Sequence, residues 1–259
     1  MSDVESAGAT GDSRKGVIPW SPGTVKEVLF QDRGGEAFTE GDIRIGDTQS
    51  VLAMAAKQPR LIPKGMGVIG EKYRWPGGRI AYQISPSLPE PQRVLEAIAH
   101  WEKHTDIRFI ERTTANANQH GNYLLFCERG GSWSYVGMQG GEQPLSLGRD
   151  AHMGNVIHEI GHAVGLWHEQ SRVDRNDHLV VLTENIRADM LSQFDQKLKD
   201  GMDLGDYDFD SVMHYPRTAF SKNGRDTLRP RTDESRTIGQ REKLSAGDIA
   251  AVKALYPKP

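Results

Sequence analysis

The stretch HEIGHAVGLWH, residues 158–168, decides how this chain is interpreted. His158 and His162 are four positions apart, and residues at this spacing on an α-helix lie on one face, so both imidazoles can converge on one ion. Gly165 lets the chain leave the helix in a backbone conformation that a residue with a Cβ resists. The turn then swings His168 back as a third nitrogen ligand. The stretch therefore predicts a helix that ends at Gly165 and a metal site built from three histidines.

The residue after the first histidine points to hydrolysis. Glu159 lies about 100° round the helix from His158, where it can reach a metal-bound water without being a ligand. Three imidazoles leave zinc an open position for water, which is typical of a catalytic rather than a structural site. A lone H-E-x-x-H pattern also occurs by chance on ordinary helices, but the added glycine and third histidine at fixed offsets disfavour chance. The pattern indicates a zinc-dependent protein hydrolase.

Two further runs narrow the kind of zinc site. Residues 169–175 read EQSRVDR and residues 211–215 read SVMHY. Together with the histidine stretch they resemble the extended zinc signature and the Met-turn of the astacin metallopeptidases, a family of the metzincin clan. Glu169 and Tyr215 are the astacin-like positions within these runs. Glycine-rich calcium repeats, which a serralysin-type peptidase would carry downstream, are absent from the sequence.

The resemblance covers residues 67–256 and implies an α+β, metzincin-like fold. Its N-terminal subdomain should hold a mixed twisted sheet and two long helices, one of which is the zinc helix. Its C-terminal subdomain should be mostly irregular, with the Met-turn and a C-terminal helix, and the active-site cleft should lie between the two. The residue pattern itself predicts a helix over residues 89–104 and strands over residues 79–84, 107–111, 123–127 and 144–147. The resemblance implies that the C-terminal helix covers residues 244–256.

Length, charge and hydropathy exclude several classes of protein. The chain has 259 residues, with 32 basic and 35 acidic side chains and a formal net charge of −3. It therefore lacks the polybasic footprint of a nucleic-acid binder. No apolar run approaches the ~20 residues of a transmembrane helix. We expect a monomer that acts on protein or peptide substrates.

The N-terminal residues do not decide in which cellular compartment the protein acts. Residues 1–15 are rich in Ser, Gly and Asp and show no apolar core of a signal peptide. The family resemblance nevertheless implies secretion. A trimmed signal, another export route and an intracellular site of action all remain open.

Cysteine usage departs from the family, whose members usually carry two disulfides. Cys127 is the single cysteine, so no intramolecular disulfide can form. Asp106 and Ser132 stand where the resemblance leads us to expect half-cystines, and no terminal cysteine precedes Pro259. We expect Cys127 to be an inert buried residue. The lack of disulfides suits a bacterial member of the family.

Residues 1–65 are expected to form a propeptide ahead of a peptidase domain over residues 66–259. They show little regular pattern and are punctuated by Pro and Gly. Within them, Gly41-Asp42-Ile43 resembles the F-x-G-D-I motif of astacin propeptides, with one extra residue after Phe38. The resemblance implies that Asp42 ligates the zinc in a latent zymogen, which an activating protease would release. The alternative is an ordinary Gly-Asp turn, since Gly-Asp-Ile recurs at residues 247–249.

The expected chemistry assigns a role to each site residue. His158, His162 and His168 hold one Zn²⁺, which lowers the pKa of its bound water toward ~7. Glu159 takes the proton as the water attacks the peptide carbonyl and passes it to the leaving amine. By resemblance, Tyr215 is an outer zinc ligand in the resting enzyme and binds the oxyanion in the transition state.

Other residues receive roles outside the zinc ligands. By resemblance, Met213 forms an apolar floor under the metal, and Glu169 receives the new N-terminus after propeptide removal. The remaining nearby histidines are expected to have packing or surface roles: His152, His178 and His214. Residues 140–147 are expected to provide an edge strand for an extended peptide substrate.

A basic run follows the Met-turn: Arg217, Lys222, Arg225, Arg229 and Arg231. It is either a solvated face or, by resemblance, the border of a pocket that favours Asp or Glu just after the scissile bond.

Two other functions compete with the peptidase. A catalytically silent zinc-binding module for adhesion or inhibition would need neither Glu159 nor Tyr215. A structural zinc domain would need a closed tetrahedral ligand set, which three histidines do not complete.

Overall fold

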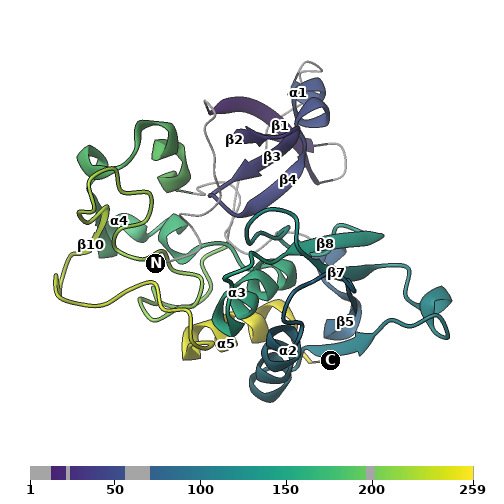
Figure 1. The fold of residues 1–259 in the computed structure, drawn as a ribbon. Helices are drawn as coiled ribbons and strands as arrows, with labels where there is room; N and C mark the ends of the chain where they lie inside the picture. The colour runs from purple at the N-terminus through teal and green to yellow at the C-terminus, as the bar shows by residue number, and fades with distance from the viewer. Residues whose placement is uncertain (1–12, 22–23, 56–70, 197–201, 259) are drawn as a thin grey trace.

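The computed structural model describes residues 13–21, 24–55, 71–196 and 202–258. Figure 1 shows helix α3, residues Met153–Val164, in the middle of the molecule, with a sheet and a second helix on one side and a mostly irregular region on the other. The N-terminal strands form a separate layer above both. This arrangement agrees with the α+β, two-subdomain fold that the resemblance implies.

The sheet of the N-terminal subdomain has the strand order β6-β5-β7-β8. All three strand pairings in it are parallel. An antiparallel bridge between Trp133 and Ser146 extends the sheet beyond β8 and makes it mixed. The predicted strands are confirmed, two with their bounds and two shifted by one or two residues: β5 (Arg79–Ile84), β6 (Arg108–Glu111), β7 (Tyr123–Cys127) and β8 (Glu142–Ser146).

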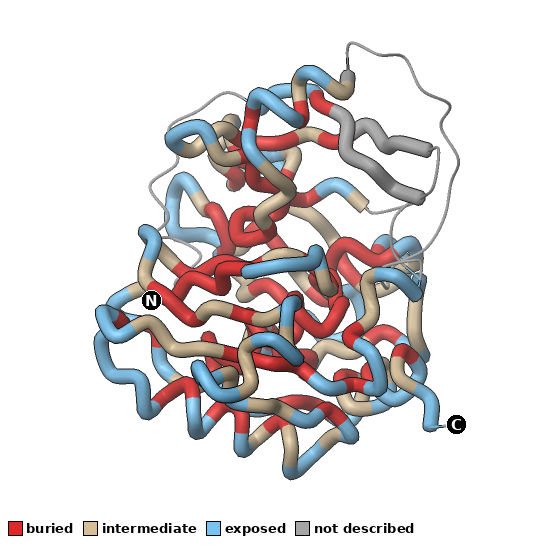
Figure 2. The backbone as a smooth tube through the Cα atoms, turned by 90° about the vertical axis from the view of Figure 1, so that its right-hand side faces the viewer, coloured by how far each residue is buried: buried red, intermediate tan, exposed pale blue. Residues whose placement is uncertain are grey.

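Two helices pack on this sheet and share its core. Helix α2, Gln92–His104, buries Val94, Ile98 and Trp101 against α3 and the strands. The indole of Trp101 donates a hydrogen bond of 3.2 Å to the backbone oxygen of Ile157 in α3. Trp101 therefore holds the inner face of the zinc helix in place, and its indole N–H has the hydrogen-bond acceptor that a buried indole needs. Figure 2 shows buried backbone running through the middle of the molecule and exposed turns at its rim.

The C-terminal subdomain contains only short elements, as expected. Its own apolar cluster is built around Phe194, Tyr215 and Phe220. The closing helix α5, Ala246–Leu255, begins at a capping box in which the Ser245 hydroxyl accepts from the Asp248 amide at 2.9 Å. The short elements are η5 (Glu169–Ser171), α4 (Arg175–His178), β9 (Leu179–Val181), η6 (Thr183–Asn185), η7 (Ala188–Phe194) and β10 (Leu228–Pro230), and three further 3₁₀ turns lie in the N-terminal subdomain: η2 (Glu71–Tyr73), η3 (Pro76–Gly78) and η4 (Ala117–Gln119).

The N-terminal segment is more regular than its sequence suggested. It forms an antiparallel sheet in the order β1-β2-β3-β4, followed by a helix, with a small core that includes Phe30 and Val51. Regularity here comes from pairing between strands, which the local Pro and Gly pattern does not reveal. The expected boundary at residues 65 and 66 lies outside the described residues. The elements are β1 (Arg14–Ser21), β2 (Thr24–Arg33), β3 (Glu36–Thr39), β4 (Ile43–Asp47) and α1 (Thr48–Ala55).

Polar contacts stand at the positions where the family carries half-cystines. Asp106 forms an ion pair with Lys258, with 3.0 Å between Oδ1 and Nζ. The Ser132 hydroxyl accepts a hydrogen bond of 3.0 Å from the amide of Gly148. Cys127 is buried at 5% exposure, and burial raises the pKa of its thiol. The buried, inert role expected for Cys127 agrees with its placement.

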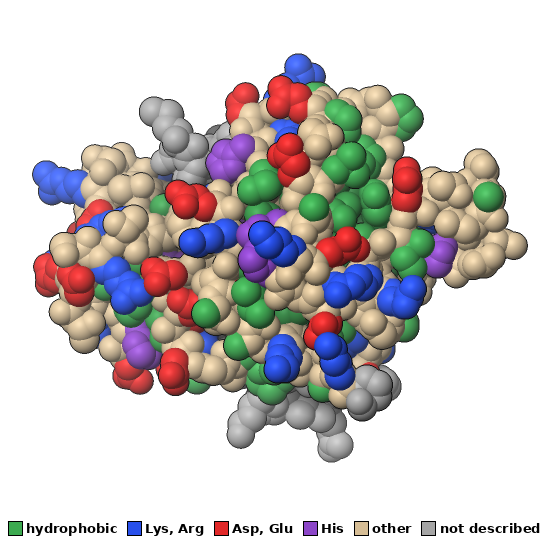
Figure 3. All heavy atoms as spheres, turned by 90° about the horizontal axis from the view of Figure 1, so that it is seen from below, with side chains coloured by type: hydrophobic (Ala, Val, Ile, Leu, Met, Phe, Trp, Pro, Cys, Tyr) green, Lys and Arg blue, Asp and Glu red, His purple; other side chains and the backbone are tan. Residues whose placement is uncertain are grey.

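The surface carries both charge signs. In Figure 3, Lys and Arg side chains alternate with Asp and Glu side chains over the face seen from below. None of the described helices is both long enough and apolar enough to cross a bilayer.

Candidate active site

The three histidines converge because helix α3 ends where the sequence predicts. His158 and His162 lie on one face of α3, with ring centroids 4.7 Å apart. Gly165 follows at φ 118°, and its amide donates to the carbonyls of Gly161 and His162, which caps the helix. The chain then turns back and places the ring of His168 4.7 Å from that of His162. The predicted helix end and the predicted histidine cluster are both confirmed.

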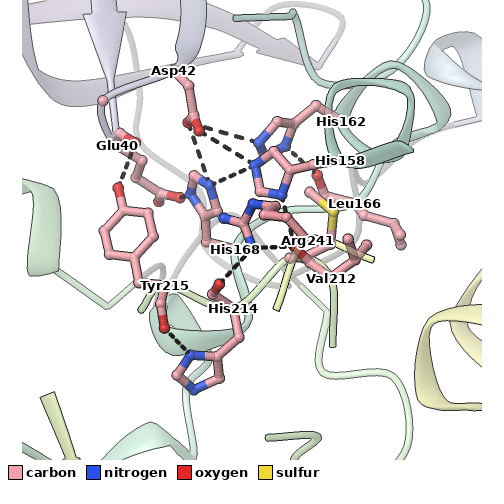
Figure 4. Close-up of polar contacts among 12 residues, drawn as sticks. Glu40, Asp42, His158, His162, Leu166, His168, Val212, His214, Tyr215 and Arg241 are labelled. Carbon is pink, nitrogen blue, oxygen red and sulfur yellow. Dashed lines mark hydrogen bonds and ion pairs between the residues drawn. The ribbon is translucent and has the colours of Figure 1, made fainter. Parts of the chain in front are cut away.

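The outer ring nitrogen of each histidine has an acceptor at 2.8 Å (Figure 4). A proton on Nδ1 that donates to this acceptor leaves the lone pair of Nε2 directed inward, the arrangement found in histidines that ligate metals. Burial lowers the pKa of His158 to about 4 and that of His162 well below its usual value, so both rings are neutral at pH 7. The acceptors are Val212 O for His158, Leu166 O for His162 and Glu40 Oε2 for His168.

Asp42 completes the cluster from the N-terminal segment. One potential ligand atom from each of the four residues lies within 4.8 Å of the others. Oδ2 of Asp42 is 3.3 Å from Nε2 of His158, and its Oδ1 is 3.3 Å from Nε2 of His168. Burial alone would raise the pKa of Asp42, but the charges and hydrogen bonds of the histidines hold this pKa well below its usual value.

The donor set fits a zinc ion. Oδ1 of Asp42 and Nε2 of His162 are buried and have no hydrogen-bond partner among the described residues. Buried polar atoms are nearly always satisfied, and two unsatisfied atoms that face one centre are explained by a cation between them. Three imidazoles and one carboxylate are also the ligand types and the number that zinc prefers.

Tyr215 borders this centre, and Glu159 is buried next to His158 in the chain. Glu159 is 2% exposed and follows His158 on α3. Tyr215 is fully buried, and its ring centroid is 4.6 Å from that of His168. Its hydroxyl donates to the backbone oxygen of Glu40 in the N-terminal segment, and burial raises its pKa well above the usual value, so the hydroxyl stays protonated.

Met213 and Glu169, which were given roles beside the zinc ligands, make contacts within the peptidase domain. Met213 is 2% exposed and packs in the same apolar cluster as Ile157 and Ile160 of the zinc helix. The carboxylate of Glu169 accepts from the amide of Asp208 at 2.8 Å, and burial raises its pKa to about 8. Its role as acceptor of a new N-terminus stays a prediction.

The other histidines lie outside the four-residue cluster. His152 caps α3 and accepts from the amide of Gly154 at 3.2 Å. His178 stacks on Tyr207, with ring centroids 4.6 Å apart. His214 is buried and is bonded to the Tyr207 hydroxyl at 2.9 Å. His152 is exposed, and His178 and His214 pack against Tyr207, which agrees with the surface or packing roles expected of the three.

The N-terminal segment pairs with backbone next to the strand that we expected to bind an extended substrate. Residues 140–147 contain β8, which is bordered by β7 on one side and by the Trp133 bridge on the other. Ser134 lies beyond that bridge and bonds to the N-terminal segment: its amide donates to Asp42 O and its carbonyl accepts from Arg44 N, both at 3.0 Å. β8 stands at the edge of the four-stranded sheet, as expected, and only its last residue, Ser146, is bridged to Trp133. Its pairing with an extended substrate stays a prediction.

The basic run after the Met-turn is neutralised in part. Arg217 forms an ion pair with Asp226, and Arg229 lies 3.6 Å from Glu234. Arg231 donates to the backbone oxygen of Asn176 at 2.6 Å. No ion pair is seen for Lys222 or Arg225 in the part of the chain that the structure describes. A preference for acidic substrates stays a prediction.

Sequence reasoning missed two residues of this site. Glu40, next to Gly41 and Asp42, bonds His168, and its place in the propeptide-like motif was the available signal. Arg241 is half-buried and donates to Val212 O at 2.7 Å, the same oxygen that accepts from His158. A lone arginine in a loop gives no signal of this kind.

Two curated proteins resemble this chain over much of its length. Tolloid-like protein 2 of Homo sapiens is 38% identical over 272 residues, which cover 98% of this chain and 26% of that protein. Blastula protease 10 of Paracentrotus lividus is 40% identical over 228 residues, which cover 84% of this chain and 38% of that protein. The chain thus spans well under half the length of either relative.

A solved structure and a family profile agree with these similarities. The high choriolytic enzyme 1 of Oryzias latipes, a hatching enzyme zinc-protease, superposes with a TM-score of 0.67 at 32% identity, over 74% of this chain and 98% of that one. The profile of the Astacin peptidase family matches residues 68–257. With its histidine cluster built for one metal ion, the chain belongs to the astacin family of zinc metallopeptidases, and its cofactor is zinc.

Proposed function

We propose that this chain is the latent form of a zinc metalloendopeptidase that hydrolyses internal peptide bonds of protein substrates. The observation that carries the proposal is the cluster of four buried side chains, three from the peptidase domain and Asp42 from the N-terminal segment, around one centre. His158, His162 and His168 are the proposed zinc ligands. Asp42 is the proposed fourth ligand in the latent form.

The proposed hydrolysis follows from the side chains around the zinc ligands. Bound zinc supplies a Lewis acid that polarises the scissile carbonyl and makes water acidic enough to attack at neutral pH. Glu159 accepts the proton of the attacking water and delivers it to the leaving amine. The protonated hydroxyl of Tyr215 donates a hydrogen bond to the oxyanion as negative charge develops there. Arg241 holds Val212 O, and through it His158, in position.

In this proposal the enzyme is latent because the side chain of Asp42, which belongs to the same chain, occupies a position at the metal site. The carboxylate of Asp42 lies where a water or a substrate carbonyl would approach the three Nε2 atoms. Because Asp42 belongs to the same chain, its effective concentration is high and even a modest ligand competes well with substrate. Gly41 lets the chain enter at φ 82°, and a Cβ at this residue would come within 2.7 Å of Phe220.

Activation requires the N-terminal segment to leave. We propose that an activating protease cuts between the segment and the peptidase domain, where Arg60 and Lys64 offer trypsin-like sites; both lie outside the described residues. Family membership supports release of the active enzyme as a monomer outside the cell.

The test compares two proteins, each with and without a zinc chelator. Full-length chain and chain freed of its N-terminal segment are incubated with casein, and new amino termini are measured. We expect turnover in the freed protein only, and we expect the chelator to abolish it. A freed protein that binds zinc but cleaves nothing would instead support a silent adhesion or inhibitory module.

A further inference from the structure

The carboxylate of Glu40 contacts His168, one of the proposed zinc ligands, at the ring nitrogen that faces away from the metal centre. Its side chain is fully buried, as is that of His168, and its Oε2 lies 2.8 Å from Nδ1 of the imidazole. Figure 4 shows the carboxylate reaching the ring on the side opposite Asp42. Glu40 therefore bonds the outer nitrogen of the ring whose inner nitrogen faces the metal centre.

This contact differs from those of the other two histidines. Nδ1 of His158 and of His162 donate to the peptide oxygens of Val212 and Leu166. Both oxygens belong to the peptidase domain, so they stay in place when the N-terminal segment leaves. Only His168 has a carboxylate acceptor in the cluster, and this acceptor leaves with the segment.

The main chain holds Glu40 in place from two sides. Its backbone oxygen accepts from the Tyr215 hydroxyl, and the next amide, of Gly41, donates to Gln193 Oε1 at 2.8 Å. Glu40 itself has φ 51°, a conformation that non-glycine residues rarely adopt and that persists where the surroundings fix it. The carboxylate is thus directed at His168 by a backbone that the peptidase domain fixes.

We propose that Glu40 is a positioning residue that tightens zinc binding in the latent form. A carboxylate acceptor fixes the tautomer of a histidine ligand and increases the donor strength of the nitrogen on the metal. The zymogen then loads and retains zinc before activation, and the mature enzyme keeps the metal without this help. The inference rests on the proposed function, because it requires His168 to be a ligand and the N-terminal segment to be released.

The test is the zinc affinity of the full-length Glu40→Gln variant. Glutamine keeps the length and an acceptor oxygen but removes the charge. Zinc affinity is measured by competition with a chromophoric chelator, and we expect the variant to bind zinc roughly tenfold more weakly than the parent, the lower end of the effect of losing such a partner. Glu36→Gln is the matched control, since Glu36 pairs with Arg44 in the same segment, away from the histidines. Its affinity should equal that of the parent.

The absorption spectrum of the Co²⁺-loaded protein is a second measurement, and it should not change if Glu40 has only a structural role. The visible absorption bands of Co²⁺-loaded Glu40→Gln should shift relative to the parent, because the donor strength of His168 changes, whereas those of Glu36→Gln should not. If Glu40→Gln does not fold, Glu40→Asp keeps the charge at a shorter reach, and its bands should shift as the contact lengthens.

Removing the N-terminal segment adds an internal control. Parent and Glu40→Gln then yield the same mature sequence, and their zinc affinities must coincide. Full-length Glu40→Gln with the affinity and the cobalt spectrum of the parent would overturn the inference, as would an equal loss in Glu36→Gln. A parent that binds no zinc at all would instead reject the proposed function, so the two failures are distinguishable.

Discussion

Oδ2 of Asp42 lies 3.3 Å from Nε2 of His158, although 116 positions separate the two residues in the chain. The contact joins the N-terminal segment to the zinc helix at the cluster of three histidines. Two residues later, the same segment bonds to the backbone of Ser134. The segment therefore covers both the metal centre and the backbone that borders it.

The first prediction concerns this contact. Asp42→Asn replaces a carboxylate by a neutral amide, which is a poorer zinc ligand, so the full-length variant should cleave a fluorogenic peptide before any activation. The parent should need limited trypsin digestion to reach a comparable rate. Asp47→Asn is the control, because Asp47 is exposed in the same segment and should leave latency unchanged. A variant that stays silent until trypsin is added would contradict the aspartate switch.

The second prediction concerns proton transfer. Glu159→Gln in the freed enzyme should keep its zinc and its fold but lose activity by roughly 10²–10⁴-fold, the range for a lost general base. Zinc content is measured by metal analysis and activity by casein hydrolysis. Loss of the metal from the purified variant would show that Glu159 acts on zinc binding instead.

The third prediction concerns the tyrosine. Tyr215→Phe removes one hydroxyl from a fully buried ring and leaves the packing in place. If this hydroxyl serves the transition state, kcat should fall by roughly 10²–10³-fold with KM nearly unchanged. Steady-state kinetics on one peptide separates the two constants. An effect confined to KM would assign Tyr215 to ordinary substrate binding.

The fourth prediction concerns cleavage preference. Lys222, Arg225 and Arg231 are the members of the basic run that lack an ion pair among the described residues. Arg231 donates to the backbone oxygen of Asn176, so Lys222 and Arg225 are the two chosen to test attraction of a substrate carboxylate. Cleavage-site profiling with a peptide library should show Asp and Glu enriched just after the scissile bond.

A matched pair of variants sharpens this experiment. The double variant Lys222→Gln, Arg225→Gln should lose the acidic enrichment, and Lys253→Gln on α5 should keep it. An even distribution of residues in the parent would identify the basic run as a solvated face.

The fifth prediction concerns the single cysteine. Burial raises the pKa of the Cys127 thiol, and only the thiolate reacts with disulfide reagents, so the native protein should react slowly at neutral pH. Ellman's reagent should titrate the thiol quickly once denaturant exposes it. Fast reaction of the native protein would show that the strand around Cys127 opens readily.

The sequence by itself determined the features that depend on short spacing. Histidines four apart, with a glycine three residues after the second, predicted the zinc helix, its end and the return of His168. Runs of β-branched, aromatic and Leu residues located four strands, and helical spacing located the helix over residues 89–104, with errors of a few residues at their ends. Such patterns are local, because one turn of helix or one strand edge sets them.

Tertiary structure alone decided which distant groups meet at the site. Three kinds of contact join residues far apart in the chain: the acceptors of His158 and His168, the hydrogen bond from Arg241 to Val212 O, and the pairing of Ser134 with the N-terminal segment. The regular sheet of that segment was missed for the same reason, since its strands are stabilised by each other rather than by their own residue order. Contacts of this kind depend on how whole elements pack, and packing is set by the shape and burial of many side chains at once.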